Sequence, residues 1–206
     1  MTVISISPTP IYYIPNTEYN ISEEELNVIN SIPMIKNRFC ELSESVHVLD
    51  LEGLSGIKKL CQYHVDQFTK EVCKIRQDFY IQTSWVTKKY KSQFHQLHTH
   101  PNSIMSGIFY IDVTRDMGPL TFKNENFLTK KFDFAYDYEE WNAINSSTYS
   151  LNVTSNSIVI FPSWLNHSVE ENQSDTPRIS IAFNVFVKDY FENCDGWQSD
   201  YGTALI

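Results

Sequence analysis

Residues 93–113 read QFHQLHTHPNSIMSGIFYIDV, a histidine-rich segment followed by an apolar run. Side chains alternate between the two faces of a β-strand, so His98 and His100 are expected to point the same way. Residues 158–167 read IVIFPSWLNH and end on a distant third histidine, His167. Neutral imidazole is the commonest metal ligand, and it suits iron, zinc, copper and nickel. The pattern therefore predicts a three-histidine metal site built on β-strands.

The second half of the chain has the composition of short β-strands. Segments rich in β-branched and aromatic residues alternate with Gly, Pro, Asn and Asp, as expected for strands joined by turns. The predicted strands are Tyr80–Val86, Gln93–His100, Ile104–Val113, Pro119–Phe122, Ser150–Val153, Ser157–Phe161 and Arg178–Val187. Strands of this length and spacing favour a β-sandwich or jelly roll. A short edge strand is also expected within residues 3–15, because prolines interrupt the pattern there.

Two helices are expected before these strands. Ser22 and Glu25 have the Ser-x-x-Glu spacing of a capping box, which predicts a helix over about residues 22–32. From Gly53 to Asp78 apolar residues recur every three or four positions, which predicts an amphipathic helix that covers a sheet. His64 lies on the inner stripe of this helix, where a packed or hydrogen-bonded histidine is the usual case.

The bulk composition limits the domain count and the partners. The chain has 206 residues, 42% of them hydrophobic, and is expected to be one mainly β (α+β) domain over 1–206. Helices over about 20–78 would pack on one face of a jelly-roll core over about 80–187. A net charge of -9 and a pI near 5.1 argue against nucleic acid and anionic membranes as partners.

Cysteine usage and hydropathy indicate the compartment. Four cysteines without a CxxC pair are typical of reduced thiols in a cytoplasmic protein. No apolar stretch approaches the roughly 18 to 20 residues of a membrane span. We therefore expect a cytoplasmic protein, and the oligomeric state is left open.

Arg178 and Ser180 add an anion-binding pair. They share one face of the last predicted strand, where a guanidinium and a hydroxyl can bind a carboxylate through charge-assisted hydrogen bonds. A charge inside an apolar strand is costly unless it is paired. Residues 123–149 lack a clear period and are interpreted as an insertion or active-site loop.

Six ordered fragments resemble one enzyme family. They are Gln82–Trp85, His98–Ser103, Ser106–Ile111, Gly118–Phe122, Ile160–His167 and Arg178–Asn184. Together these fragments resemble the 2-oxoglutarate and Fe(II)-dependent oxygenases, specifically the branch of short prolyl-hydroxylase-like proteins also encoded by bacteriophages. The cytoplasm would then be that of a phage host.

This resemblance implies a double-stranded β-helix, the jelly roll indicated by the strand pattern, and a set of site residues. His98 and His167 would be iron ligands, and Arg178 would bind the distal carboxylate of 2-oxoglutarate. Tyr110 lies at the position where the family often places a tyrosine hydroxyl on the same carboxylate, and Ser180 completes an Arg-x-Ser pair. The cofactors would be Fe(II), 2-oxoglutarate as co-substrate, and O2.

One residue departs from the family pattern. Most members have His-x-Asp or His-x-Glu, whereas the third residue here is His100, so the 2-His-1-carboxylate triad is not literally present. Three interpretations remain: His100 is the third ligand, water replaces the carboxylate, or His100 orients substrate beside the metal. Strand geometry favours direct ligation. His95 falls on the opposite strand face in this interpretation and is expected to be structural.

The resemblance also implies the activity. The protein would be a dioxygenase that hydroxylates an unactivated C–H bond of a small-molecule or peptide substrate, with a prolyl residue as the first to test. Asn102, Trp85 and Asn184 flank the predicted site and could line the pocket or contact substrate. Two alternatives are a cupin-like metal dioxygenase or isomerase without 2-oxoglutarate, and a non-catalytic jelly-roll binding module.

Overall fold

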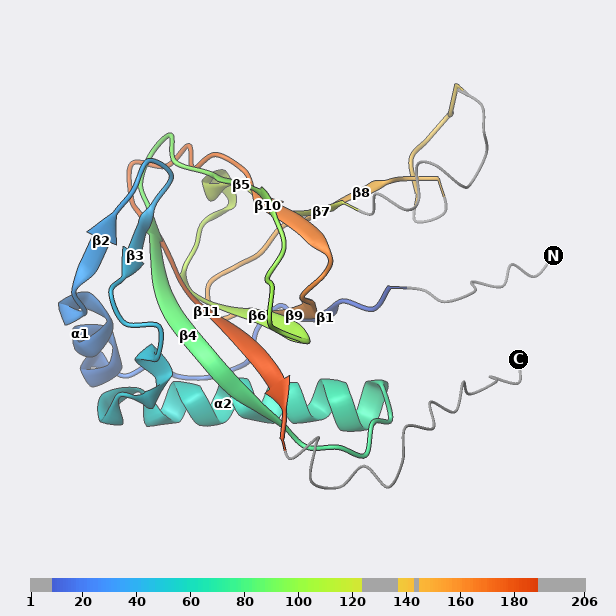
Figure 1. The fold of residues 1–206 in the computed structure, drawn as a ribbon. Helices are drawn as coiled ribbons and strands as arrows, with labels where there is room; N and C mark the ends of the chain where they lie inside the picture. Colours follow the sequence, from blue (N-terminus) through green and yellow to red (C-terminus); the bar gives the residue numbers. More distant parts are fainter. Residues whose placement is uncertain (1–8, 124–136, 143–144, 189–206) are drawn as a thin grey trace.

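Two antiparallel sheets form the body of the protein (Figure 1). The computed structural model describes residues 9–123, 137–142 and 145–188. Within these residues the larger sheet has seven strands, in the order β1 (Tyr12–Ile14), β9 (Ile158–Pro162), β6 (Met105–Asp112), β11 (Arg178–Val187), β4 (Phe79–Lys89), β3 (Glu41–Ser43) and β2 (Met34–Lys36). The smaller sheet has four described strands, in the order β5 (His95–His98), β10 (Asn166–Val169), β7 (Leu120–Lys123) and β8 (Thr148–Leu151). This is the predicted jelly roll.

Every predicted strand segment contains a strand, but the sequence pattern missed three others. β2 and β3 are only three residues long, too short to show a period. β10 lies in a segment for which no strand was predicted, and it is a strand because both neighbours, β5 and β7, pair with it. Backbone pairing with distant segments decided this element, and local composition does not report such pairing.

The larger sheet is buried on both faces, which explains its continuous apolar runs. On the outer face Phe109, Ile160 and Phe183 pack with the helices. On the inner face Tyr110 and Phe161 pack with residues of the smaller sheet, including Phe122. Alternate residues of one strand therefore enter two different cores, and the inner core lies beside the three histidines.

The helices cover the outer face of the larger sheet (Figure 1). α1 (Glu23–Ser31) starts at the predicted capping box, in which the Ser22 hydroxyl accepts a hydrogen bond from the Glu25 backbone N–H. Two 3₁₀ turns, η1 (Val48–Asp50) and η2 (Glu52–Leu54), lead into α2 (Ser55–Asp66), and a third, η4 (Arg115–Met117), precedes β7. The second predicted helix is thus confirmed at its start.

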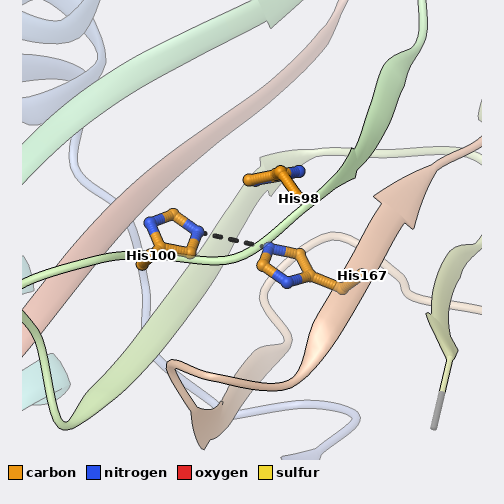
Figure 2. Close-up of side chains that lie close together, drawn as sticks. All are labelled: His98, His100 and His167. Carbon is orange, nitrogen blue, oxygen red and sulfur yellow. Dashed lines mark hydrogen bonds between the residues drawn. The ribbon is translucent and has the colours of Figure 1, made fainter. Parts of the chain in front are cut away.

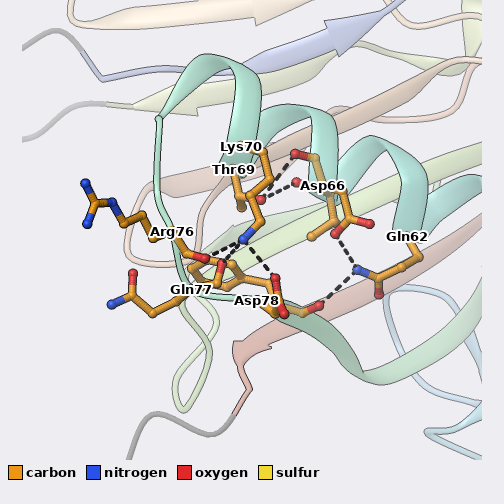
Figure 3. A network of polar contacts seen from close by, with 9 residues as sticks. Gln62, Asp66, Thr69, Lys70, Arg76, Gln77 and Asp78 are labelled. Atoms are coloured by element: carbon orange, nitrogen blue, oxygen red, sulfur yellow. Dashed lines mark hydrogen bonds and ion pairs between the residues drawn. The ribbon is translucent and has the colours of Figure 1, made fainter. Parts of the chain in front are cut away.

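The end of that helix was predicted too far along the chain. α2 continues as a π-helical turn, η3 (Gln67–Val72), and the chain then turns toward β4. Figure 3 shows the contacts made at this turn: the Lys70 ammonium donates to the carbonyls of Arg76 (2.6 Å) and Gln77 (2.7 Å) and lies 2.8 Å from the Asp78 carboxylate. These contacts hold residues 73–78 folded back against η3 instead of continuing the helix.

His64 has the structural role expected from the sequence. Its side chain is 6% exposed, and its Nδ1 lies 2.9 Å from the Tyr12 hydroxyl of the edge strand β1. Among the described residues no helix is long and apolar enough to span a membrane. The predicted loop over 123–149 falls largely on residues outside the described set, at 124–136 and 143–144.

Candidate metal centre

Three imidazoles meet at the edge of the smaller sheet (Figure 2). His98 ends β5 and His167 lies in β10, and the two residues are direct partners in the antiparallel pairing of these strands. His100 follows two residues after the end of β5. One ligand atom from each ring lies within 4.8 Å of the others. The three histidines predicted from the sequence are therefore brought together, although His167 is 67 residues from His100 along the chain.

His100 reaches the cluster from a loop, not from a strand as the sequence analysis assumed. Its backbone N–H donates to the Ser163 carbonyl (3.0 Å), which holds the loop after β5 against the turn before β10. The Ser163 hydroxyl is hydrogen-bonded to Ser103 and Ser106, both at 2.8 Å. These hydroxyls tie the loop after His100 to the turn at Ser163, so the ring is positioned by tertiary contacts.

The ring nitrogens are oriented for metal binding. The Nδ1 atoms of His98 and His167 lie 2.8 and 3.0 Å from the carbonyls of Gln96 and Leu165. A ring whose Nδ1–H donates to a carbonyl presents the Nε2 lone pair to a metal. The Nε2 atoms of His100 and His167 are 3.2 Å apart. Two ligands of one ion with metal–nitrogen bonds of about 2.0–2.1 Å lie about 2.9 to 3.4 Å apart, so this separation fits a shared ion.

Burial keeps these imidazoles neutral, the form that binds metal. Desolvation, followed by the charge of His98, lowers the pKa of His167 to about 3. The same two causes lower the pKa of His100 to about 4. Burial also lowers the pKa of His98. The cluster therefore needs little proton release to accept a cation near neutral pH.

These pKa values set the expected pH dependence of metal binding. Histidines with the ordinary pKa near 6.5 would lose about a thousandfold in combined affinity between about pH 7.5 and 5.5, because three protons compete with the metal. With depressed pKa values, Fe(II) affinity is expected to fall far less than this over the same range, as measured by anaerobic calorimetry. A thousandfold decline would show that the site is open to water.

The same shift makes the metal-free fold acid-sensitive. The pKa of His167 is lower in the folded than in the unfolded chain, so the unfolded chain takes up the proton first as the pH falls below about 6.5. For His167, which is 2% exposed, the loss in the free energy of unfolding is about 1.4 kcal/mol by pH 5.5. Urea unfolding of the metal-free protein at about pH 7.5 and about pH 5.5 measures this loss.

His95 lies on the same face as His98, contrary to the simple alternation expected from the sequence. His98 pairs with His167, but His95 pairs with Val169, so β5 has one extra residue and a bulge. The rings of His95 and His98 stack at 4.2 Å with an interplanar angle of 15°. Within the described residues, the set with ligand atoms close enough to hold a metal comprises His98, His100 and His167, without His95.

Arg178 lies in the pocket next to the histidines and is only partly satisfied. Its side chain is 2% exposed, and Nη1 donates to the carbonyls of Met117 (3.2 Å) and Gly118 (2.5 Å). Nη2 is buried and has no hydrogen-bond partner. The guanidinium carbon lies 5.0 Å from the ring centre of Tyr110, whose buried hydroxyl also has no partner. Burial raises the pKa of Tyr110, so this hydroxyl stays a donor.

The carbonyl that holds Arg178 depends on a glycine. Gly118 has φ +77, a left-handed conformation that residues with a Cβ rarely adopt. A Cβ added there would lie 2.7 Å from the Glu170 carbonyl oxygen. The backbone conformation of Gly118 therefore directs its carbonyl oxygen toward Arg178. This carbonyl accepts from Nη1, and Nη2 remains without a partner.

The two unpartnered donors fit a bound carboxylate. Tyr110, Ser180 and Arg178 line one pocket together with the three histidines. A buried donor without a partner is costly, and a carboxylate accepts from a guanidinium and a hydroxyl at once. The donor set of the pocket thus fits a metal ion at one end and an anionic group at the other.

Sequence reasoning missed one charged residue of this pocket. Lys89 ends β4, is 4% exposed and lies directly opposite Arg178 in the sheet. Burial, followed by repulsion from Arg178, lowers the pKa of Lys89 to about 7. The run Lys88-Lys89 resembles a solvated strand end, and the only available signal was the alternation Trp85, Thr87, Lys89 on one face.

The three residues proposed to flank the pocket have different positions. Trp85 lines it, with its ring 5.7 Å from that of His100. Asn102 lies in the adjoining loop with φ 58 and lines a neighbouring depression that also includes Trp164. The side-chain oxygen of Asn184 accepts a hydrogen bond from Ser106 (2.9 Å). Asn184 thus contributes to the serine network that supports the loop.

Comparison with known proteins gives the family. Residues 83–184 match the model of the family described as "Putative 2OG-Fe(II) oxygenase". This match spans all the pocket residues described above, from Trp85 to Ser180. No curated protein shows significant sequence similarity to the chain.

Solved structures of several oxygenases share the fold. The α-ketoglutarate-dependent epimerase SnoN from nogalamycin biosynthesis is 11% identical, with a TM-score of 0.62 over 86% of this chain and 76% of that chain. HygX from Streptomyces hygroscopicus, with nickel and 2-oxoglutarate bound, is 10% identical, with a TM-score of 0.60 over 86% and 82%. A Trichoplax adhaerens prolyl hydroxylase in complex with a peptide fragment is 15% identical, with a TM-score of 0.57 over 85% and 83%.

Proposed function

Because the chain belongs to the 2-oxoglutarate/Fe(II) oxygenase superfamily, with Fe(II), 2-oxoglutarate and O2 as its cofactors, we propose that it is a hydroxylase acting on an unactivated C–H bond. Its substrate would be a small molecule or a peptide, and a prolyl residue is the first to test. The observation that carries this proposal is one pocket with three convergent imidazoles and two unpartnered buried donors.

His98, His100 and His167 would hold the metal. All three rings are neutral at physiological pH, so the bound cation keeps its full charge and attracts a dianionic co-substrate. Direct ligation by His100 is supported by the 3.2 Å separation of its Nε2 from that of His167. When bound, Fe(II) couples oxidative decarboxylation of 2-oxoglutarate by O2 to oxidation of a substrate C–H bond.

Arg178, Tyr110 and Ser180 would bind the distal carboxylate of 2-oxoglutarate. The free Nη2 of Arg178 and the free Tyr110 hydroxyl would each donate one hydrogen bond, and Ser180 lies on the same strand face as Arg178. The two carbonyls that hold Nη1 prevent the guanidinium from rotating. The chain would thus orient the co-substrate before O2 binds, which limits unproductive oxidation.

Apolar residues would exclude water from one side of the metal. The ring of Phe161 lies 4.6 Å from that of His167 in an edge contact, and Phe122 lies 6.2 Å away. Trp85 and His100 border the other side, toward the depression that includes Asn102. We propose that substrate enters from that side, where Trp85 and Asn102 would contact it.

Prolyl hydroxylation is supported by analogy only, because two of the similar structures are prolyl hydroxylases while others catalyse epimerisation or carbocycle formation. The test begins with anaerobic titration of Fe(II) and 2-oxoglutarate, in which a metal-to-ligand charge-transfer band is expected. Oxygenated turnover with proline-containing peptides should then release succinate and add one oxygen atom to the peptide. Substrate oxidation without succinate would instead support the cupin-like alternative, and absence of metal binding the non-catalytic one.

A further inference from the structure

Lys89 lies next to Arg178, the residue proposed to bind the co-substrate carboxylate. It is the direct cross-strand partner of Arg178, since β4 and β11 pair with Lys89 opposite Arg178. Opposite residues of an antiparallel pair carry their side chains on the same face, with Cβ atoms about 4.5–5.5 Å apart. Lys89 and Arg178 also line the same pocket. Two cationic side chains therefore share one end of that pocket.

The Lys89 ammonium has no counter-ion in the described part of the chain. Its side chain is 4% exposed, and neither a hydrogen bond nor an ion pair is formed by its Nζ there. The described residues that line the pocket include no Asp or Glu. The titratable groups coupled to Lys89 are Arg178, which repels it, the buried thiol of Cys40, and the imidazoles of His95 and His98. Like charges placed opposite one another destabilise a sheet unless an anion compensates them.

We propose that Lys89 is a second cationic anchor of the pocket, which binds the distal carboxylate of 2-oxoglutarate together with Arg178. This inference rests on the proposed function. Arg178 is held by two carbonyls and offers one free nitrogen. Lys89 supplies a further donor from the neighbouring strand, so the carboxylate is held from two directions. The pair makes the pocket selective for dicarboxylic over monocarboxylic 2-oxo acids.

A purely structural lysine would give a different response to substitution. Lys89→Met keeps the apolar stem and removes the charge, so a packing role would be preserved. If Lys89 binds an anionic ligand, Lys89→Met without metal and ligand is expected to be more stable than the wild type without them. The reason is that the substitution removes a buried cation that no anion compensates. A rise in Tm of about 2 to 4 °C is expected.

The test compares Lys89→Met with Lys88→Met, a neighbour whose side chain extends to Asn30 on the other side of the strand. Both variants change the net charge equally. Anaerobic calorimetry on the Fe(II)-loaded proteins uses 2-oxoglutarate and pyruvate as probes. Lys89→Met should weaken 2-oxoglutarate binding about 10- to 100-fold and leave pyruvate binding unchanged, because pyruvate has no distal carboxylate. Lys88→Met should leave both unchanged.

The calorimetric results either support or overturn the proposed role of Lys89. Wild-type affinity for 2-oxoglutarate in Lys89→Met, or an equal loss for pyruvate, overturns the anchor while leaving the oxygenase proposal intact. No binding of 2-oxoglutarate by the wild type overturns both. Lys89→Gln serves as a second variant if Lys89→Met does not fold, and the same loss is expected for it.

Discussion

Replacing His167 by alanine is expected to abolish measurable Fe(II) binding and, with it, turnover. His167 is central to the cluster: its ring centre lies 4.2 Å from that of His98 and 5.0 Å from that of His100. Its Nδ1 is held by the Leu165 carbonyl, so its Nε2 is committed to the pocket. Loss of one of three protein ligands should weaken binding by at least about a thousandfold, more than the 10- to 100-fold of an outer-shell change. Anaerobic calorimetry measures it.

Two further variants make the His167 result interpretable. His64→Ala removes another buried histidine, hydrogen-bonded to Tyr12 and remote from the site, so it should lower stability and leave Fe(II) affinity unchanged. His100→Ala distinguishes the interpretations of the third residue: loss of Fe(II) affinity identifies a ligand, whereas retained metal binding with impaired turnover identifies an orienting role. Fe(II) binding by His167→Ala with wild-type affinity would remove the proposed metal centre.

Replacing Arg178 by methionine is expected to weaken 2-oxoglutarate binding about 100- to 1000-fold while sparing Fe(II) affinity. The buried guanidinium has a free Nη2 and lies in the metal pocket, so its positive charge and one charge-assisted hydrogen bond to a carboxylate are lost with it. The charge-transfer band should appear only at correspondingly higher 2-oxoglutarate concentration, with an unchanged Fe(II) titration.

The control for this variant is Arg115→Met, which removes an exposed arginine of η4 close in sequence to the Arg178 carbonyl partners. It should bind both ligands normally. Arg178→Lys tests whether the planar guanidinium is needed. A lysine keeps the positive charge, but its single nitrogen cannot donate to the Met117 and Gly118 carbonyls and also reach the carboxylate as a guanidinium does. Unchanged 2-oxoglutarate affinity in Arg178→Met would exclude Arg178 as the carboxylate anchor.

Much of the fold follows from local pattern. The capping box at Ser22 starts α1, the amphipathic repeat after Gly53 gives α2, and β-branched segments give the strands of the two sheets. These elements depend on how apolar residues repeat over a few positions, every three or four residues in a helix and every second residue in a strand. This pattern can be read from the sequence alone. The pairing of His98 and His100 with a distant His167 was likewise suggested by sequence spacing.

What the tertiary structure alone decided concerns contacts between distant segments. The bulge that turns His95 to the face of His98, the strand that carries His167, and the serine chain that places His100 all depend on pairing partners elsewhere in the chain. The register that sets Lys89 against Arg178 joins positions 89 residues apart. Local periodicity shows which side chains are apolar. Strand register and desolvation arise only when separate strands pair. The charge balance of the pocket and the pKa values of its residues could therefore not be obtained from the sequence by itself.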